Sequence, residues 1–356
     1  MQYDARVIVP QLRDWGYNIL TLMKINFQHS MSAHCENGVT SNLLRFYGVN
    51  LSEPMVFGLG SGLFFSHMPF IKLNGMAVTS FRPWPGVIFK RVTRLLGIQY
   101  DRKKFANNKQ MAIQELDRLL AQGTPVGMLV GVFNLSYFPK EYRFHFNAHN
   151  ITAFGKEGDT YYISDPVMEN VETLSTDELL RVRYAEGTYP PKGRMYYITK
   201  VPKDIDLNTA IVKSIQRTCK DMLTIPIHMF GVNGIRFLAK RVRKWPAKFG
   251  PKLAALNLSQ VIRMLEEIGT GGAGFRFIYA AFLQECSVKL NQAWLNDLSK
   301  EMTDIGDKWR EFAYLAARGY KGRDKQEISY DMLADLLLAI ADREEKVFRQ
   351  LRQIKL

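Results

Sequence analysis

His34-Cys35-Glu36-Asn37-Gly38 is the most informative stretch of this sequence, because it places a cysteine just before a helical pattern. The apolar residues that follow recur with helical spacing, at Val39, Leu43, Leu44 and Tyr47. This spacing predicts a helix whose first turn carries Cys35. Backbone N–H groups and the helix dipole meet at a helix start and favour the thiolate, which is the nucleophilic form of cysteine. A thiol in that position is typical of acyl-transfer enzymes that use a cysteine.

The composition of the 356-residue chain is that of a globular protein large enough for two domains, with 47% hydrophobic and 23% charged residues. Three widely spaced cysteines do not make a disulfide framework and favour a reducing compartment. The first six residues lack the apolar core of a signal peptide, so we expect a cytoplasmic protein. A charge-free stretch from Pro54 to Ile71 holds two prolines and three glycines, which favours a buried strand-and-turn region over a membrane span.

The pattern of the chain changes near residue 204. Before this point helix-like and strand-like segments are mixed, with helices expected at 87–96 and 109–121. Strands are expected at 126–132, 150–154, 161–164 and 195–198. After this point helical periodicity continues, with breaks near 226, 246–251, 269–274 and 319–322. We therefore expect an α+β domain over residues 1–204 and an all-α domain over residues 205–356.

A β-hairpin signal downstream supplies a histidine and an acid. Two β-prone runs, His149–Phe154 and Thr160–Asp165, flank a turn that contains glycine. With the turn centred on Glu157 or Gly158, the numbers of opposite residues sum to about 314 or 315, so His149 is expected opposite Asp165 or the following proline. The carboxylate then reaches one imidazole nitrogen, since neighbouring strands lie about 4.8 Å apart, and the other nitrogen is left to face a thiol. Cysteine, histidine and acid in this chain order are typical of papain-like folds.

Each of these residues also has an ordinary structural interpretation. A lone cysteine before an apolar helix is usually a small buried hydrophobe. A histidine at a strand start is usually structural, and Asp165 before proline is a common turn initiator. The combination of all three favours the catalytic interpretation. His145 and His149 have metal-like spacing, but without a third ligand we expect no metal site.

Several short motifs are similar to those of a known family. They are His34-Cys35-Glu36, Leu43-Leu44-Arg45-Phe46-Tyr47-Gly48, Phe57-Gly58-Leu59-Gly60-Ser61-Gly62, Gly123-Thr124-Pro125-Val126, Tyr137-Phe138-Pro139, His149, Asp165-Pro166 and Gly269-Thr270-Gly271-Gly272. Together they resemble the butirosin biosynthesis protein H family, in which a helical domain usually follows the N-terminal domain. The resemblance covers nearly the whole chain.

The resemblance implies a papain-like acyltransferase that takes an acyl group from the phosphopantetheine thioester of an acyl carrier protein. On the matching positions Cys35 is the nucleophile, His149 the base and Asp165 the residue that orients the base. No intrinsic cofactor is implied, because the carrier protein brings the phosphopantetheine arm. Gln28, seven residues before Cys35, is a candidate side-chain donor to the oxyanion, or else a loop residue that pairs with the backbone.

The net charge of +14 predicts an anionic partner. A segment without acids, residues 236–252, concentrates basic side chains at Arg236, Lys240, Arg241, Arg243, Lys244, Lys248 and Lys252. It fits docking of the acidic carrier protein, contact with an anionic membrane surface, or an ordinary solvated face. We expect no nucleic-acid binding, because no motif for reading bases accompanies the charge.

These observations predict transfer of a carrier-bound acyl group, through a Cys35 acyl-enzyme, to an amine or hydroxyl of a small-molecule or lipid acceptor. The setting would be specialised-metabolite or lipid biosynthesis. One alternative is a thioesterase or amidase, in which water replaces the acceptor. Another is a non-catalytic scaffold that binds carrier protein.

Overall fold

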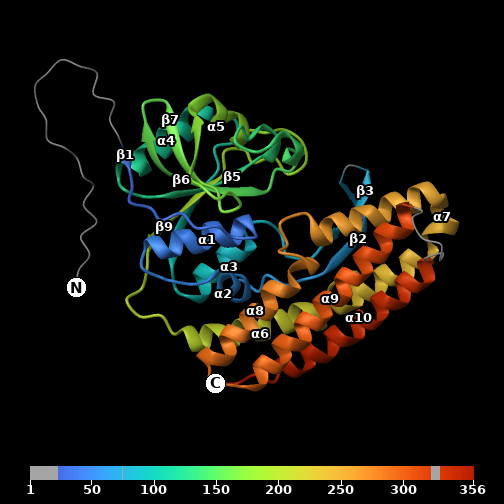
Figure 1. The fold of residues 1–356 in the computed structure, drawn as a ribbon. Coiled ribbons are helices and arrows are strands. Elements are labelled where there is room, and N and C mark those ends of the chain that lie inside the picture. The colour runs from blue at the N-terminus through green and yellow to red at the C-terminus, as the bar shows by residue number, and fades with distance from the viewer. Residues whose placement is uncertain (1–22, 74, 322–328) are drawn as a thin grey trace, which may run out of the picture. The chain divides into compact units, whose positions relative to one another are not determined.

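The structure is a computed structural model that describes residues 23–73, 75–321 and 329–356 (Figure 1). The first six residues, from which we predicted the absence of a signal peptide, lie outside these ranges. So does Gly322, the last residue of the break expected at 319–322. The described residues divide into two compact units, the first made of residues 23–51 and 97–203, the second of those within 52–96 and 204–356. One boundary falls beside residue 204, where the sequence pattern changes. Residues 52–96, which we expected in the first domain, belong instead to the second unit.

The first unit is built on a seven-stranded antiparallel sheet, ordered β4-β9-β5-β6-β7-β8 with β1 also paired to β6. Its strands are β1 (Met23–Lys24), β4 (Gln99–Lys103), β5 (Val126–Val130), β6 (His149–Glu157), β7 (Thr160–Ser164), β8 (Glu172–Ser175) and β9 (Met195–Lys200). Its helices are α1 (Cys35–Phe46), α4 (Lys109–Ala121) and α5 (Thr176–Arg183), with short 3-10 turns η1 (Val132–Asn134) and η2 (Lys140–Tyr142).

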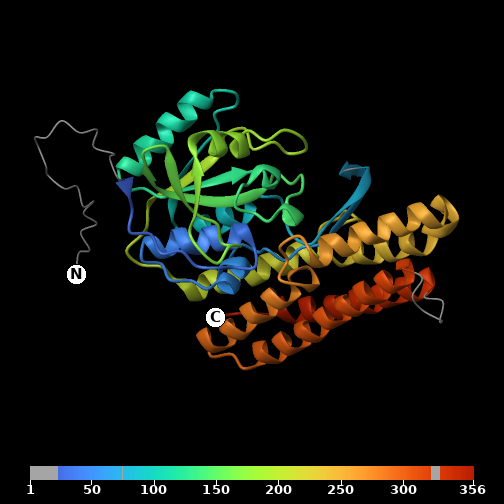
Figure 2. The ribbon, with the colours of Figure 1, turned by 45° about the horizontal axis from the view of Figure 1, so that its top comes forward.

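The sheet of the first unit lies between two helical layers. Helix α1 covers one face, and α4 and α5 cover the other (Figures 1 and 2). The side chains of β6 alternate between these layers, as the pleat of a strand requires. Ile151 and Ala153 enter the core shared with α4 and α5, whereas Phe154 stacks on Phe27. The expected α+β architecture is confirmed.

The hairpin of β6 and β7 forms, but its expected register was wrong. Thr152 pairs with Ser164, so Asp165 lies just beyond the paired strand and diagonal to His149. The turn is the two-residue loop Gly158–Asp159, in which Gly158 has a positive φ of 56°. An irregularity between Ala153 and Gly155 shifts the register again. Neither the loop position nor the bulge follows from the β-prone composition of the two runs.

The second unit is mostly helical. Its helices are α2 (Glu53–Leu59), α3 (Val87–Leu95), α6 (Leu207–Leu223), α7 (Gly231–Glu266), α8 (Arg276–Lys289), α9 (Trp294–Lys321) and α10 (Tyr330–Leu351), with a 3-10 turn η3 (Ala273–Phe275) and a hairpin of β2 (Ser66–Leu73) and β3 (Met76–Ser80). Helices α7, α9 and α10 run side by side (Figures 1 and 2). The expected break at 246–251 is a kink within α7 at Gly250, whose φ is 73°. No helix in the described ranges is both long enough and apolar enough to cross a bilayer.

Residues 54–59 correct the strand-and-turn expectation, because they form helix α2. The Ser52 side chain accepts a hydrogen bond from the backbone N–H of Met55 at 3.1 Å, and Pro54 occupies the first turn, as is common at helix starts. Helix α2 packs against α6 and α8, which explains why this segment belongs to the helical unit. A Cβ atom at Gly58 would lie 2.2 Å from the Phe282 ring, so glycine is required for this close approach.

Candidate active site

Cys35 is the first residue of α1, as the sequence predicted. The thiol is 6% exposed, and every residue of the helix from Cys35 to Leu44 is buried. Gly38 lets the chain after β7 approach the first turn closely, because a Cβ atom there would lie 2.3 Å from the Pro166 side chain. The backbone N–H of Ser32 donates to the Pro166 carbonyl at 2.7 Å. These contacts hold the Asp165–Pro166 segment beside the start of α1.

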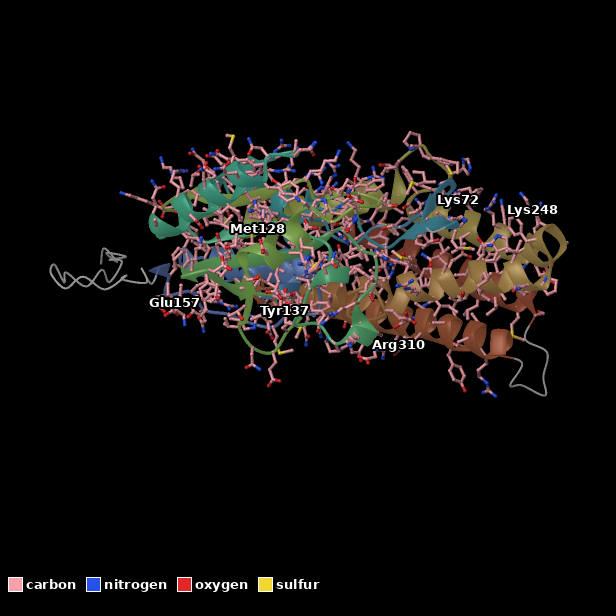
Figure 3. The ribbon with its side chains drawn as sticks, turned by 90° about the horizontal axis from the view of Figure 1, so that it is seen from above. Lys72, Met128, Tyr137, Glu157, Lys248 and Arg310 are labelled. Atoms are coloured by element: carbon pink, nitrogen blue, oxygen red, sulfur yellow. The ribbon has the colours of Figure 1, made fainter. Side chains whose placement is uncertain are left out.

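His149 and Asp165 form a buried hydrogen-bonded pair. His149 Nε2 donates to Asp165 Oδ2 over 2.7 Å, and the two residues are 5% and 0% exposed. The Tyr137 hydroxyl donates to the same oxygen at 2.9 Å, and the Val167 backbone N–H donates to Oδ1 at 3.2 Å. Both oxygens of the carboxylate therefore accept hydrogen bonds, two at Oδ2 and one at Oδ1, which fixes its orientation. Tyr137, labelled in Figure 3, entered the sequence argument only through the family motif.

The charge state of His149 follows from its neighbours. Burial opposes protonation, but the Asp165 carboxylate, the charge of the Cys35 thiolate and hydrogen bonds to both raise the pKa of His149 to about 10. The imidazole is therefore protonated at neutral pH, with Nε2 on the carboxylate and the other side of the ring toward the thiol. Phe138 packs edge to face on the imidazole, with ring centroids 5.6 Å apart, and helps to keep it dry. A thiolate–imidazolium pair is the reactive state of cysteine enzymes.

Two further residues lie at the thiol and were not found from the sequence. Asn150 Nδ2 lies 4.0 Å from Cys35 Sγ, and Asn150 Oδ1 accepts a hydrogen bond from the Tyr196 hydroxyl at 2.9 Å. The charge of Cys35 helps to raise the pKa of Tyr196, which agrees with this proximity. The sequence carried one signal, since Asn150 directly follows the candidate histidine.

The segment before Cys35 is anchored to the sheet. The His29 ring hydrogen-bonds with the Ser164 hydroxyl at 2.8 Å and donates to the Met168 carbonyl at 3.2 Å. The Asn42 side chain of α1 donates to the Ser30 carbonyl at 3.0 Å. Gln28, the predicted oxyanion donor, is exposed, whereas Cys35 is buried. Its role in the reaction stays a prediction.

The other titratable candidates lie apart from this site. Cys219 and Cys286 are fully buried free thiols of α6 and α8 in the second unit. Burial raises the pKa of both, to about 12 for Cys219. His145 stacks on the Phe133 ring with centroids 4.1 Å apart. Among residues 23–73, 75–321 and 329–356, no group of three or more His, Cys, Asp or Glu side chains is placed to hold a metal ion.

The predicted docking cations of α7 fall into two groups. Arg236 pairs with Asp342 at 2.6 Å and Glu345 at 2.5 Å on α10, and Arg243 pairs with Asp331 and Asp335 on the same helix. Arg241 is half-buried over the Phe237 ring. The lysines of the segment are exposed, with helical spacing along α7 for Lys240, Lys244 and Lys248 (Figure 3 labels the last) and with Lys252 beyond the kink at Gly250.

Comparison with protein families and solved structures adds the context for this geometry. Residues 34–166 match the family described as butirosin biosynthesis protein H, N-terminal. The chain carries a butirosin H N-terminal domain. Residues 177–351 match a domain of unknown function (DUF4872), which follows the butirosin H domain here. A C39-like peptidase from Bacillus anthracis is similar with a TM-score of 0.35 and 13% identity, over 51% of this chain and 99% of that chain. A search of curated proteins found no match.

The butirosin H domain contains each residue of the predicted triad. The nucleophile candidate begins a helix on one face of an antiparallel sheet, and the histidine and acid come from one hairpin of that sheet. This is the arrangement by which papain-like enzymes activate a thiol. Family and geometry together indicate a cysteine enzyme of papain-like acyl-transfer or peptidase type.

Proposed function

We propose that this protein is a cysteine acyltransferase that takes an acyl group from an acyl carrier protein and passes it to an amine or hydroxyl acceptor. The observation that carries the proposal is the buried His149–Asp165 pair, 2.7 Å apart, beside a thiol at a helix start. A thiolate held by an imidazolium attacks thioesters readily, because a thiol leaves as easily as a thiol adds. Membership of the butirosin H N-terminal family supports this reaction over peptide cleavage.

The proposed reaction has two half-reactions on the same three residues. Cys35 Sγ bonds to the thioester carbonyl carbon, the carbonyl electron pair moves onto oxygen, and collapse breaks the bond to the pantetheine sulfur. That sulfur leaves with the proton of the His149 imidazolium. The acceptor amine or hydroxyl then attacks the acyl-enzyme while neutral His149 takes its proton. Collapse releases the product and restores the thiolate–imidazolium pair. Asp165 stays ionised and holds the ring throughout.

The acceptor decides between the transferase and a thioesterase or amidase. Both form the same acyl-enzyme, and they differ only in whether an amine, a hydroxyl or water attacks it. The family that matches the N-terminal domain is named for a biosynthesis protein, which favours transfer to an amine or hydroxyl of a metabolite over hydrolysis by water. An acyl-enzyme that persists in buffer and is discharged by an added amine supports transfer.

The first test is intact-mass analysis after mixing the protein with an acyl carrier protein loaded with an octanoyl group. The expected result is an octanoyl adduct on wild type and none on Cys35→Ala. Octanoyl-N-acetylcysteamine, which lacks the carrier protein, should form the same adduct more slowly. Absence of any adduct with both donors would overturn the proposal, as would an adduct retained by Cys35→Ala.

Docking of the carrier is a second part of the proposal. Arg236 and Arg243 are already paired with carboxylates, so the exposed lysines of α7 are the better candidates for an acidic partner. Changing Lys240, Lys244 and Lys248 to Glu should slow acylation by the loaded carrier at low salt and leave the small thioester unaffected. The matched control carries the same three charge changes at exposed lysines of α6 and α8, Lys213, Lys220 and Lys289. Equal rates in both triple variants would remove α7 from the docking surface.

A further inference from the structure

The amide of Asn150 is oriented so that its nitrogen faces the active-site sulfur. An amide nitrogen carries two hydrogens. Asn150 Nδ2 donates to the Ala148 carbonyl at 3.3 Å and lies 4.0 Å from Cys35 Sγ. Both hydrogens therefore have a direction, one toward the backbone and one toward the sulfur.

The Tyr196 hydroxyl fixes this orientation from the opposite side of the amide. It donates to Asn150 Oδ1 at 2.9 Å, so the carbonyl end of the amide is held away from the sulfur. Burial, and then the charges of Glu36 and Cys35, hold the pKa of Tyr196 well above its ordinary value, while Arg102 opposes this shift. The hydroxyl therefore stays protonated, and it remains a donor over the working pH range.

A glycine allows Tyr196 to reach Asn150 across the sheet. Tyr196 is on β9 and Asn150 on β6, and β5 runs between them, so the two strands are about 10 Å apart. Gly127 of β5 pairs directly with Tyr196. A Cβ atom at Gly127 would lie 2.4 Å from the tyrosine ring. The Tyr196 ring thus crosses β5 over Gly127, through space that a side chain at this position would fill.

We propose that Asn150 is a catalytic hydrogen-bond donor to the Cys35 sulfur and to the oxyanion, and that Tyr196 positions it. The proposal rests on the proposed function in one respect, because the oxyanion forms only when the Cys35 sulfur adds to the carbonyl carbon of an acyl donor. Asn150 would then supply the side-chain donor to the oxyanion for which the sequence offered Gln28, a residue whose side chain is exposed. A donor fixed before the reaction stabilises the developing charge without reorganisation.

The test compares the pH dependence of Cys35 alkylation by iodoacetamide, followed by peptide mass, in four proteins. They are wild type, Asn150→Ala, Tyr196→Phe and the control Tyr197→Phe. Tyr197 is the next residue of β9, and its hydroxyl donates to Asp101 at 3.3 Å, away from the thiol. Loss of a donor to the thiolate should move the alkylation midpoint up by about one pH unit in Asn150→Ala. Tyr196→Phe should shift it in the same direction by less, and the control should not shift.

Single-turnover acylation by octanoyl-N-acetylcysteamine provides a second readout. Acylation should slow about 100-fold in Asn150→Ala and about tenfold in Tyr196→Phe. Tyr196→Phe keeps the ring and serves as the deciding variant if Asn150→Ala does not fold. Unchanged alkylation midpoints in both variants would overturn the inference. Alkylation needs no acyl donor, so it tests Asn150 independently of the proposed function. Rapid alkylation of Cys35 in wild type without any acylation would refute only the proposed function.

Discussion

The Asp165→Asn substitution tests the charge of the His149–Asp165 pair with little change in shape. With its one amide oxygen in place of Oδ2, asparagine can still accept from the Tyr137 hydroxyl, which lies 2.9 Å from that oxygen, whereas its NH2 group then faces the Val167 N–H that donates to Oδ1 in wild type. It removes the negative charge that keeps His149 protonated. Burial, which lowers the pKa of His149, then acts without its strongest opponent.

The magnitude follows from the two charge states of His149. With its pKa at about 10, nearly every molecule carries the imidazolium at pH 7.5. Without the carboxylate the pKa falls toward the ordinary value of about 6.5, at which about a tenth of the molecules remain protonated at pH 7.5. The thiolate loses its counter-charge in the rest. Alkylation of Cys35 by iodoacetamide at pH 7.5 should therefore slow by about tenfold or more.

The same substitution changes how stability depends on pH. The folded-state pKa of His149 lies above the unfolded value of about 6.5, so the pair stabilises the protein fully below pH 6.5. That stabilisation, at most on the order of 5 kcal/mol, is lost progressively as pH rises from about 6.5 through about 10. Urea denaturation of wild type should show this loss, and that of Asp165→Asn should not.

The matched control is Asp117→Asn on α4, across the sheet from α1. Asp117 also accepts a tyrosine hydroxyl and a cation, from Tyr161 at 2.6 Å and Lys156 at 2.7 Å. It should keep the wild-type rate of Cys35 alkylation. If Cys35 of Asp165→Asn is alkylated as fast as that of wild type at pH 7.5, with the same pH profile, the carboxylate does not control the charge of His149.

Three further predictions concern packing and burial. Gly38→Ala should slow alkylation of Cys35 and destabilise the first unit by about 1–3 kcal/mol, because its Cβ overlaps the Pro166 side chain. Gly48→Ala also destabilises, since φ is 83° there, but its Cβ meets no atom within 4 Å and it should leave alkylation unchanged. Cys219 and Cys286 should resist iodoacetamide until urea unfolds the helical unit, and peptide mapping would contradict this if either matched the active-site thiol in native protein. Glu344→Gln should lower the unfolding free energy of the helical unit by about 3–5 kcal/mol in urea denaturation, because its fully buried partner Arg276 loses its counter-charge. A loss below about 1 kcal/mol would contradict this prediction.

Local chemistry explains where the sequence predicted the structure well. Helix α4 has the expected bounds, since Asn108 caps its start and Gly123 adopts a positive φ just after its end. Helix α1 begins at Cys35, where the apolar spacing placed it. The hairpin that brings His149 to Asp165 was also predicted, because alternation and a glycine turn are properties of adjacent residues.

Other features escaped prediction because the signal was weak or lay elsewhere. The turn between α8 and α9 contains neither glycine nor proline, and Asn291 supplies its positive φ of 52°. The start of α2 was overlooked although Ser52 and Pro54 are ordinary start signals. Nothing local assigns residues 52–96 to the helical unit, since that depends on contacts with helices more than a hundred residues away.

The sequence by itself determined which residues are the candidates for the chemistry, since a cysteine at a helix start and a histidine–acid hairpin follow from short-range periodicity and turn composition. Only the tertiary structure decided how the hairpin is registered and which amide faces the sulfur. The contact between Tyr196 and Asn150 passes over Gly127, and the three residues come from three different strands. Such a contact depends on sheet order and on the space above one strand, and neither quantity is a property of any single segment.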